Sequence, residues 1–110
     1  MSHNIIIPTD MHPRPKPHEE SAAVILSKYF DCDVRFIVPT DRNTPDILMR
    51  NIDWEMKSPI GNGKNNIQKN MREASRQSSN IVIDLRRPKL HQSRAIGYVR
   101  EYLSHPNKIK

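Results

Sequence analysis

The chain has 110 residues, 35% hydrophobic and 27% charged, which is enough for one modest core and too little for two. Its single cysteine, Cys32, excludes an intrachain disulfide and fits a reducing compartment. No apolar run is long enough to cross a membrane and no secretory signal is evident, so we expect no membrane segment and a cytoplasmic site of action.

The charge is unevenly distributed along the chain. The net charge is +6, but residues 1–56 carry six Lys/Arg against nine Asp/Glu, whereas residues 57–110 carry twelve against three. An acidic half followed by a basic half is what a metal site beside a phosphate-binding surface would need. A solvated basic surface without a ligand is the alternative, and charge alone leaves both open.

The N-terminal third predicts a strand, a linker and a helix. Residues 4–8 favour a short strand at a sheet edge, and three prolines within residues 13–17 predict an extended linker, so we separate residues 1–17 from a single domain at 18–110. Residues 18–30 predict a helix. Glu19 lies at the edge of its apolar side, where it either complements the helix dipole or supplies an acid to a site. The expected apolar side comprises Ala22, Val24, Ile25, Leu26, Tyr29 and Phe30.

Residues 33–39 predict a strand, and residues 44–59 hold the most informative pattern. Residues 47–49 favour a part-buried strand, residues 50–53 a turn and residues 54–57 a second strand, which together make a hairpin. Side chains alternate along a strand, so Glu55 and Lys57 should share one face, with Trp54 and Met56 on the other. Asp46, at the start of the first strand, comes beside Glu55 and Lys57 when the hairpin closes.

Two carboxylates and a lysine in this arrangement have a definite chemical use. Carboxylate oxygens are hard ligands that suit Mg²⁺ or Mn²⁺. Such a metal lowers the pKa of a bound water and neutralises charge on a phosphate, while the lysine stabilises the transition state. The spacing Pro-Asp, eight residues, Glu-x-Lys is the signature of PD-(D/E)XK nucleases. A solvated strand face explains the same short pattern without any function.

The rest of the chain predicts a loop over residues 58–66, a helix over 67–79, a central apolar strand over 80–85 and a helix over 93–104. In the last helix we expect Ala95, Ile96, Val99 and Leu103 to point inward. Gln77 could reach the site from the end of its helix. The residues expected to hold a nucleic-acid backbone are Lys64, Lys69, Arg72, Arg76, Arg86 and Arg87, although a solvated helix face is again the alternative.

The order helix, strand, hairpin, loop, helix, strand resembles the core of the PD-(D/E)XK fold, which implies an α/β (α+β) class with a small mixed sheet flanked by helices. More specifically, residues 44–48, 54–61 and 74–87 resemble the C-terminal tRNA-nuclease domains of contact-dependent growth inhibition toxins, the CdiA proteins. The resemblance implies bacterial or mobile-element origin, tRNA cleavage with a divalent metal and a cognate immunity protein. By this resemblance the catalytic and metal-binding residues fall on Glu19, Asp46, Glu55 and Lys57, with Gln77 as a further site residue.

We therefore expect a toxin-like, metal-dependent nuclease that cleaves RNA, with tRNA favoured. One alternative is a DNA endonuclease of the same fold, since the choice of RNA rests on the resemblance. The other is a non-catalytic nucleic-acid-binding module. The intact set of Asp46, Glu55 and Lys57 argues against that alternative, because a binding module has little use for carboxylates that face phosphate.

Overall fold

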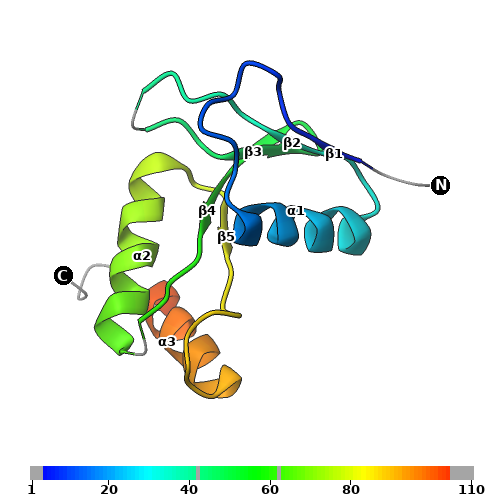
Figure 1. The fold of residues 1–110 in the computed structure, drawn as a ribbon. Helices are drawn as coiled ribbons and strands as arrows, with labels where there is room; N and C mark the ends of the chain where they lie inside the picture. Colours follow the sequence, from blue (N-terminus) through cyan, green and yellow to red (C-terminus); the bar gives the residue numbers. More distant parts are fainter. Residues whose placement is uncertain (1–3, 42, 62, 105–110) are drawn as a thin grey trace.

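The described residues fold into one five-stranded mixed sheet with three helices, which confirms the expected α+β class (Figure 1). The structure is a computed structural model that describes residues 4–41, 43–61 and 63–104. In chain order the elements are β1 (Ile5–Ile6), α1 (Pro17–Phe30), β2 (Val34–Phe36), β3 (Ile47–Met49), β4 (Ile52–Lys57), α2 (Lys64–Gln77), β5 (Ile81–Ile83) and α3 (Gln92–Ser104).

The strands follow one another across the sheet in sequence order, β1-β2-β3-β4-β5. Strands β2, β3 and β4 form an antiparallel meander, whereas β1 pairs parallel to β2 and β5 pairs parallel to β4. A parallel pair needs a crossover connection, and α2 supplies it between β4 and β5. The arrangement places β5 at one edge of the sheet and β1 at the other.

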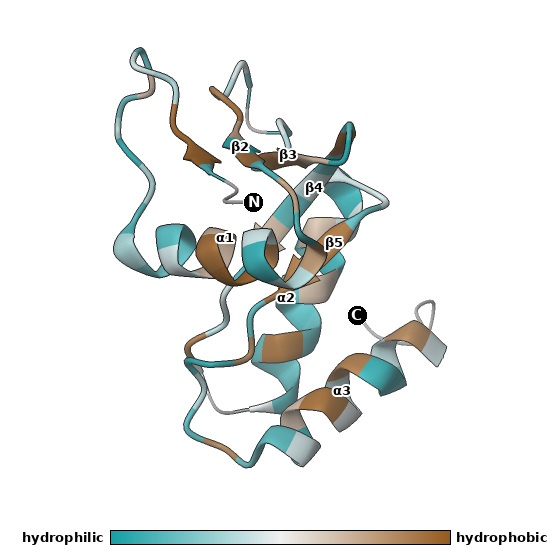
Figure 2. Cartoon of the chain, turned by 90° about the vertical axis from the view of Figure 1, so that its right-hand side faces the viewer, coloured by the Kyte–Doolittle hydropathy of each residue, from teal (hydrophilic) through white to brown (hydrophobic). Residues whose placement is uncertain are grey.

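The main core lies between α1 and one face of the sheet. Ala23 of α1 packs there with Val34, Phe36, Ile47 and Met49, all nearly inaccessible to solvent. Trp54 and Met56 of β4 pack against the same cluster, so the alternation predicted for the hairpin is confirmed. In Figure 2 the middle of α1 carries hydrophobic colour, and further hydrophobic bands lie on α2 and α3.

Helix α2 packs against β4 and β5 and also contacts α3. Its buried side comprises Ile67, Gln68, Met71 and Ala74. Helix α3 packs on α2 rather than on the sheet, with Ala95 and Tyr102 buried. The amide of Gln68 donates to the carbonyl of Tyr98 at 3.2 Å, which ties the two helices together. No helix within the described residues is long and apolar enough to span a bilayer.

Several local expectations were wrong in ways that have clear physical causes. The hairpin turn is only Arg50–Asn51, with φ of 55° and 62°, and β4 accordingly starts at Ile52. Helix α2 starts at Lys64, three residues earlier than predicted, and ends at Gln77. Strand β5 was expected to be central but lies at the sheet edge.

The apolar sides predicted for α1 and α3 are also only partly buried. Ile25 on α1 is 48% exposed, and Ile96 and Leu103 on α3 are 39% and 64% exposed. Helix α1 buries Ala22, Ala23 and Ser27 and packs Leu26 and Phe30 against the core, whereas α3 buries Ala95 and Tyr102. The remaining exposed hydrophobic side chains of α1 are Val24 and Tyr29.

Candidate active site

Asp46, Glu55 and Lys57 come together on the face of β4 opposite the main core. Asp46 precedes β3, and its backbone N–H donates to the carbonyl of Trp54 at 3.0 Å. Its Oδ2 accepts a hydrogen bond from the backbone N–H of Met56 at 2.7 Å. The carboxylate therefore takes the acceptor position that a backbone carbonyl of the neighbouring strand would normally occupy, and it lies beside Glu55. Lys57 Nζ lies 3.5 Å from Glu55 Oε2. The predicted convergence of the three side chains is therefore present.

Glu55 is the unusual member of this group because its carboxyl is almost fully buried, with 4% of the side chain exposed. Burial, followed by the negative charge of Asp46, raises the pKa of Glu55 to about 8, although Lys57 opposes the shift. Its Oε1 is buried and has no hydrogen-bond partner among the described residues. A buried carboxyl oxygen without a partner is costly, and it indicates that a group from outside the chain completes this site.

A divalent cation fits that requirement. Asp46 and Glu55 supply adjacent oxygen ligands, and Mg²⁺ is commonly held by one or two carboxylates while substrate phosphate and water fill its other positions. A cation would give Glu55 Oε1 a partner and would favour the ionised form of both carboxyls. The described residues contain no group of three or more His, Cys, Asp or Glu side chains that could hold a metal. A cation at this site would therefore have the two carboxylates as its ligands from the described residues.

The structure uses Glu19, predicted as a third acid, in another way. Its Oε1 accepts the backbone N–H of Lys16 at 2.7 Å, which caps the first turn of α1. This is the helix-terminus role that the sequence left open for Glu19. A metal-binding role for Glu19 stays a prediction, and it would require the side chain to leave the cap.

A second charged cluster lies where β5 ends, next to the start of α1. Asp84 binds Arg86 through two side-chain hydrogen bonds of 2.8 and 2.7 Å, and this interaction holds the pKa of Asp84 below its usual range. Arg86 also donates to Ser21 Oγ at 2.8 Å and to the carbonyl of His18 at 3.3 Å. Arg86, predicted to grip phosphate, is thus occupied in joining β5 to α1.

Arg87 lies on the other side of this cluster and closer to β4. Its Nη1 is 3.3 Å from His18 Nε2 and donates to the carbonyl of Ser58 at 3.5 Å. Ser58 directly follows Lys57, so Arg87 lies near the end of the strand that carries the site. Sequence reasoning passed over His18 and Asp84. The signal for Asp84 was its position, since the carboxyl ends of two parallel strands lie at the same sheet edge.

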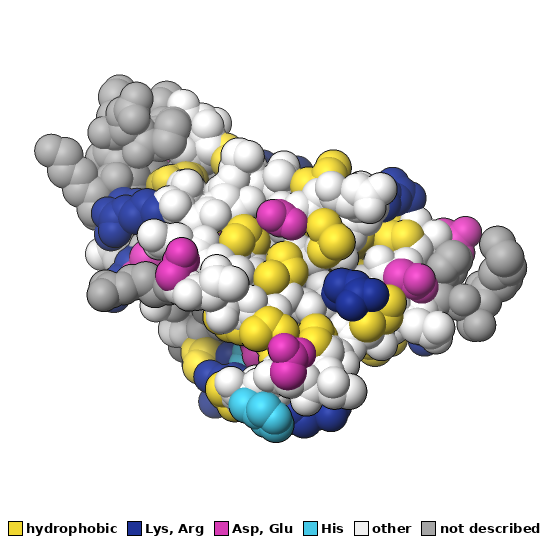
Figure 3. Space-filling model, turned by 90° about the horizontal axis from the view of Figure 1, so that it is seen from above, with side chains coloured by type: hydrophobic (Ala, Val, Ile, Leu, Met, Phe, Trp, Pro, Cys, Tyr) yellow, Lys and Arg dark blue, Asp and Glu magenta, His cyan; other side chains and the backbone are white. Residues whose placement is uncertain are grey.

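The basic side chains of α2 differ in whether they form ion pairs and in how exposed they are. Lys64 forms an ion pair with Glu101 of α3 at 2.6 Å, and Lys69 lies 4.0 Å from Glu73. Arg76 is exposed and Arg72 is half-buried on the same helix. In its described part, the face seen in Figure 3 mixes hydrophobic side chains with charges of both signs and forms no continuous basic surface. On α2 itself, Lys64 and Lys69 lie beside acids, whereas Arg76 is exposed.

Gln77 is the last residue of α2 and lies close to the strand that carries the acids. The next residue, Ser78, directs its Oγ to the carbonyl of Asp53 at 3.5 Å, which holds the end of α2 beside β4. The position of Gln77 is compatible with the additional site role predicted for it, which stays a prediction.

The model of one protein family, described as the contact-dependent growth inhibition CdiA C-terminal domain, matches residues 42–110, which is 69 of the 110 residues. The chain belongs to this family. No curated protein and no solved structure matches the chain. The CdiA C-terminal domain is a bacterial toxin module that typically pairs with an immunity protein, so the chain is toxin-like.

The extent of the CdiA family match separates the predicted site residues into two groups. Asp46, Glu55, Lys57 and Gln77 all lie within the matched residues, together with β3, β4, α2 and β5. Glu19 and the whole of α1 lie outside the match. The part of the site that the structure assembles around β4 is thus the part that the family model covers.

Proposed function

We propose that this CdiA C-terminal domain is a metal-dependent endonuclease of the PD-(D/E)XK type that cleaves RNA, with tRNA as its substrate. The observation that carries the proposal is the buried Glu55 carboxyl beside Asp46, with an unpartnered oxygen and Lys57 within reach. A merely solvated strand face, the alternative considered from the sequence, would leave Glu55 exposed to water. Its burial therefore favours a functional site.

The topology supports the same proposal. The run α1, β2, β3, β4, α2, β5, with a meander followed by a parallel crossover, matches the core order expected for PD-(D/E)XK nucleases. In that order the acid and the Glu-x-Lys belong to one hairpin, and here Asp46 directly precedes β3 while Glu55 and Lys57 lie on β4. The choice of RNA and of tRNA rests on the sequence resemblance to CdiA tRNA-nuclease domains.

Each side chain has a distinct task in this scheme. Asp46 and Glu55 would hold Mg²⁺ or Mn²⁺, which supplies Lewis-acid chemistry at the scissile phosphate when bound. Lys57, 23% exposed, is placed to contact a phosphate oxygen and to stabilise the charge that develops there. Arg87, near the end of β4, would orient the adjacent nucleotide, and Lys64, Lys69, Arg72 and Arg76 would contact the backbone beyond it.

Incubating the purified protein with total tRNA, in Mg²⁺ or in EDTA, tests the proposal. We expect discrete fragments in Mg²⁺ and none in EDTA. Glu55→Ala should abolish them, whereas Asp53→Asn, an exposed carboxylate on the same face of β4, should leave them unchanged. Circular dichroism confirms that each variant is folded. Absence of fragments from the folded wild type in both Mg²⁺ and Mn²⁺ would refute the tRNA-nuclease proposal.

Two further readouts refine the reaction and the substrate. Mapping the new RNA ends distinguishes attack by water from attack by a ribose 2′-hydroxyl, because the second leaves a cyclic phosphate. Labelled duplex and single-stranded DNA in the same assay test the choice of RNA. Cleavage of DNA but not of tRNA would support the proposed metal site and refute the proposed RNA substrate. We further propose that a cognate immunity protein neutralises this activity in the cytoplasm of the target cell.

A further inference from the structure

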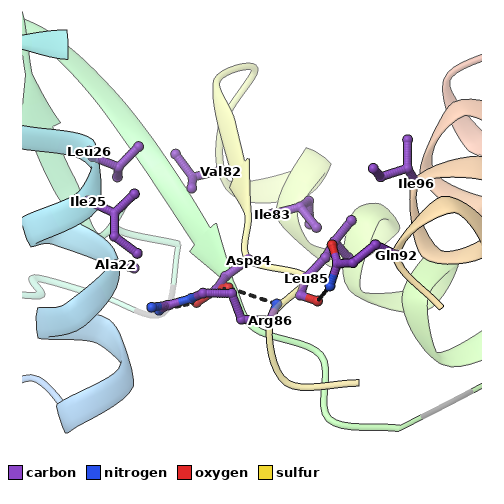
Figure 4. A pocket seen from close by; sticks show the side chains of 10 residues that line it. All are labelled: Ala22, Ile25, Leu26, Val82, Ile83, Asp84, Leu85, Arg86, Gln92 and Ile96. Atoms are coloured by element: carbon purple, nitrogen blue, oxygen red, sulfur yellow. Dashed lines mark hydrogen bonds and ion pairs between the residues drawn. The ribbon is translucent and has the colours of Figure 1, made fainter. Parts of the chain in front are cut away.

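A groove of about 350 Å³ runs along β5 between α1 and α3, on a part of the molecule that the proposed nuclease site does not use. Ile25 and Leu26 of α1 line one wall, Val82 and Ile83 of β5 form the floor, and Ile96 of α3 lines the other wall (Figure 4). At one end the amide of Gln92 donates to the carbonyl of Leu85 at 2.9 Å. The groove is therefore apolar along its length and closed by polar groups at that end.

The floor of the groove is an unpaired strand edge. The N–H of Asp84 donates to the carbonyl of Lys57, and the carbonyl of Asn80 accepts the N–H of Glu55, so these residues of the strand point their backbone toward β4. By alternation the backbone groups of Ile81 and Ile83 point away from β4, toward the open edge. Within the described residues β5 is the last strand of the sheet. An open edge of this kind can pair with a further strand.

The sequence of β5 is unusual for an edge. Ile-Val-Ile is typical of a strand covered on both faces and paired on both sides, which is why a central position was expected. Natural edges are usually protected by charged residues, proline or a bulge, and Ile81–Ile83 has none of these. The exposed Ile25 and Ile96 stand on either side of the same edge. The open edge of β5 and the two isoleucines beside it together resemble the core of a sheet from which one strand is missing.

The charge of the protein near the groove indicates which kind of protein segment could bind there. Exposed Arg100 lies one turn beyond Ile96 on α3, and the chain as a whole carries a net charge of +6. The nearest acid, Asp84, is already bound to Arg86. A second copy of this chain, with net charge +6, would bring like charges together, whereas an acidic segment would be attracted.

We propose that this groove binds an extended segment of an acidic partner protein, which adds to β5 as a sixth strand. Its central residues are apolar on both faces, because α1 lies on one side of the added strand and α3 on the other. Its acidic residues flank that centre, and one of them contacts Arg100. The inference is independent of the nuclease assignment, since none of the groove residues belongs to the Asp46–Glu55–Lys57 site.

The test uses the full chain labelled with ¹⁵N and the capped peptide Glu-Glu-Val-Ala-Val-Ala-Val-Glu-Glu. We expect the amide signals of Ile81 and Ile83 to shift on titration, because their N–H groups acquire carbonyl partners. A peptide with lysine in place of every glutamate should bind at least about tenfold more weakly. A third peptide, N-methylated at its valines, should also lose binding, because it cannot complete the strand pairing.

Matched variants locate the site on the protein. Ile25→Glu should abolish the shifts, whereas Ile60→Glu, at an exposed isoleucine outside the groove, should not. Both positions are exposed, so both variants should fold, and the dispersion of the spectra verifies it. No shift of the Ile81 and Ile83 amides with the acidic peptide would overturn the proposal. Equal binding of the lysine peptide, or concentration-dependent dimerisation through β5 in sedimentation, would overturn the acidic partner.

Discussion

Two buried carboxyls on neighbouring strands have opposite environments. Asp84, at the end of β5, is 7% exposed and is held by the guanidinium of Arg86, so its pKa is lowered. Glu55, in the middle of β4, is 4% exposed and lies beside another carboxylate, so its pKa is raised to about 8. Similar burial therefore produces opposite shifts, and the partner of each carboxyl decides the sign.

The difference indicates which of the two serves structure and which serves function. The chain itself satisfies Asp84, and its ion pair extends through Arg86 to Ser21, joining β5 to α1. The chain leaves Glu55 Oε1 without a partner and places Asp46 where it makes the ionised form more costly. An arrangement that destabilises the protein alone is expected at a ligand site, because the ligand supplies the missing interaction.

The largest expected effect comes from Glu55→Gln, which removes the charge and keeps the shape. We expect the cleavage rate to fall by about 10²-fold or more, since one group that stabilises transition-state charge is lost. Mg²⁺ should raise the melting temperature of the wild type and leave that of Glu55→Gln unchanged. Calorimetry with and without Mg²⁺ measures this. A variant that still gains stability from Mg²⁺ would place the metal elsewhere.

The second effect is a pH dependence of the metal-free protein. Because the folded-state pKa of Glu55 is about 8 against a usual value of 4.5, the folded state holds a proton that the unfolded state has released between these pH values. The free energy of unfolding in EDTA should therefore fall as pH rises from about 4.5 to 8, by on the order of 5 kcal/mol.

Urea unfolding at several pH values measures this loss. Glu55→Gln is the control, and its stability should vary less across the same window because glutamine does not titrate. At pH 8 without metal the variant should be more stable than the wild type, although it is inactive. If wild type and variant show the same dependence of unfolding free energy on pH, burial of the Glu55 charge is not the cause of that dependence.

Asp84→Asn should reduce stability by about 1–2 kcal/mol, because it removes two charge-assisted hydrogen bonds to a partly exposed arginine. The folded pKa of Asp84 is lowered, so its contribution is present above the usual value of 3.8 and is lost as pH falls further through the folded pKa. A double-mutant cycle with Arg86→Met isolates the pair. A coupling free energy near zero would mean that the contact contributes nothing measurable.

The sequence predicted the site better than its surroundings, for a reason that these two acids illustrate. Alternation along one hairpin was enough to place Glu55, Lys57 and Asp46 together, since it depends only on local geometry. Burial of Glu55 depends on α2 covering β4, and the capture of Arg86 depends on Ser21, 65 residues away. Neither is encoded in a nearby pattern. Likewise, the composition of β5 could not reveal that the described sheet ends there.

The smallest expected effect concerns Arg76 on α2, which is exposed and would act only on the substrate. Arg76→Ala should weaken tRNA binding a few-fold and lower the slope of log affinity against log salt concentration by about 1, as expected for one lost phosphate contact. Arg35→Ala, an exposed arginine on β2, should change neither quantity. Filter binding at several salt concentrations, with Glu55→Gln as the inactive background, measures both. If Arg35→Ala and Arg76→Ala weakened binding equally, the effect would be one of net charge and α2 would not be the phosphate-binding surface.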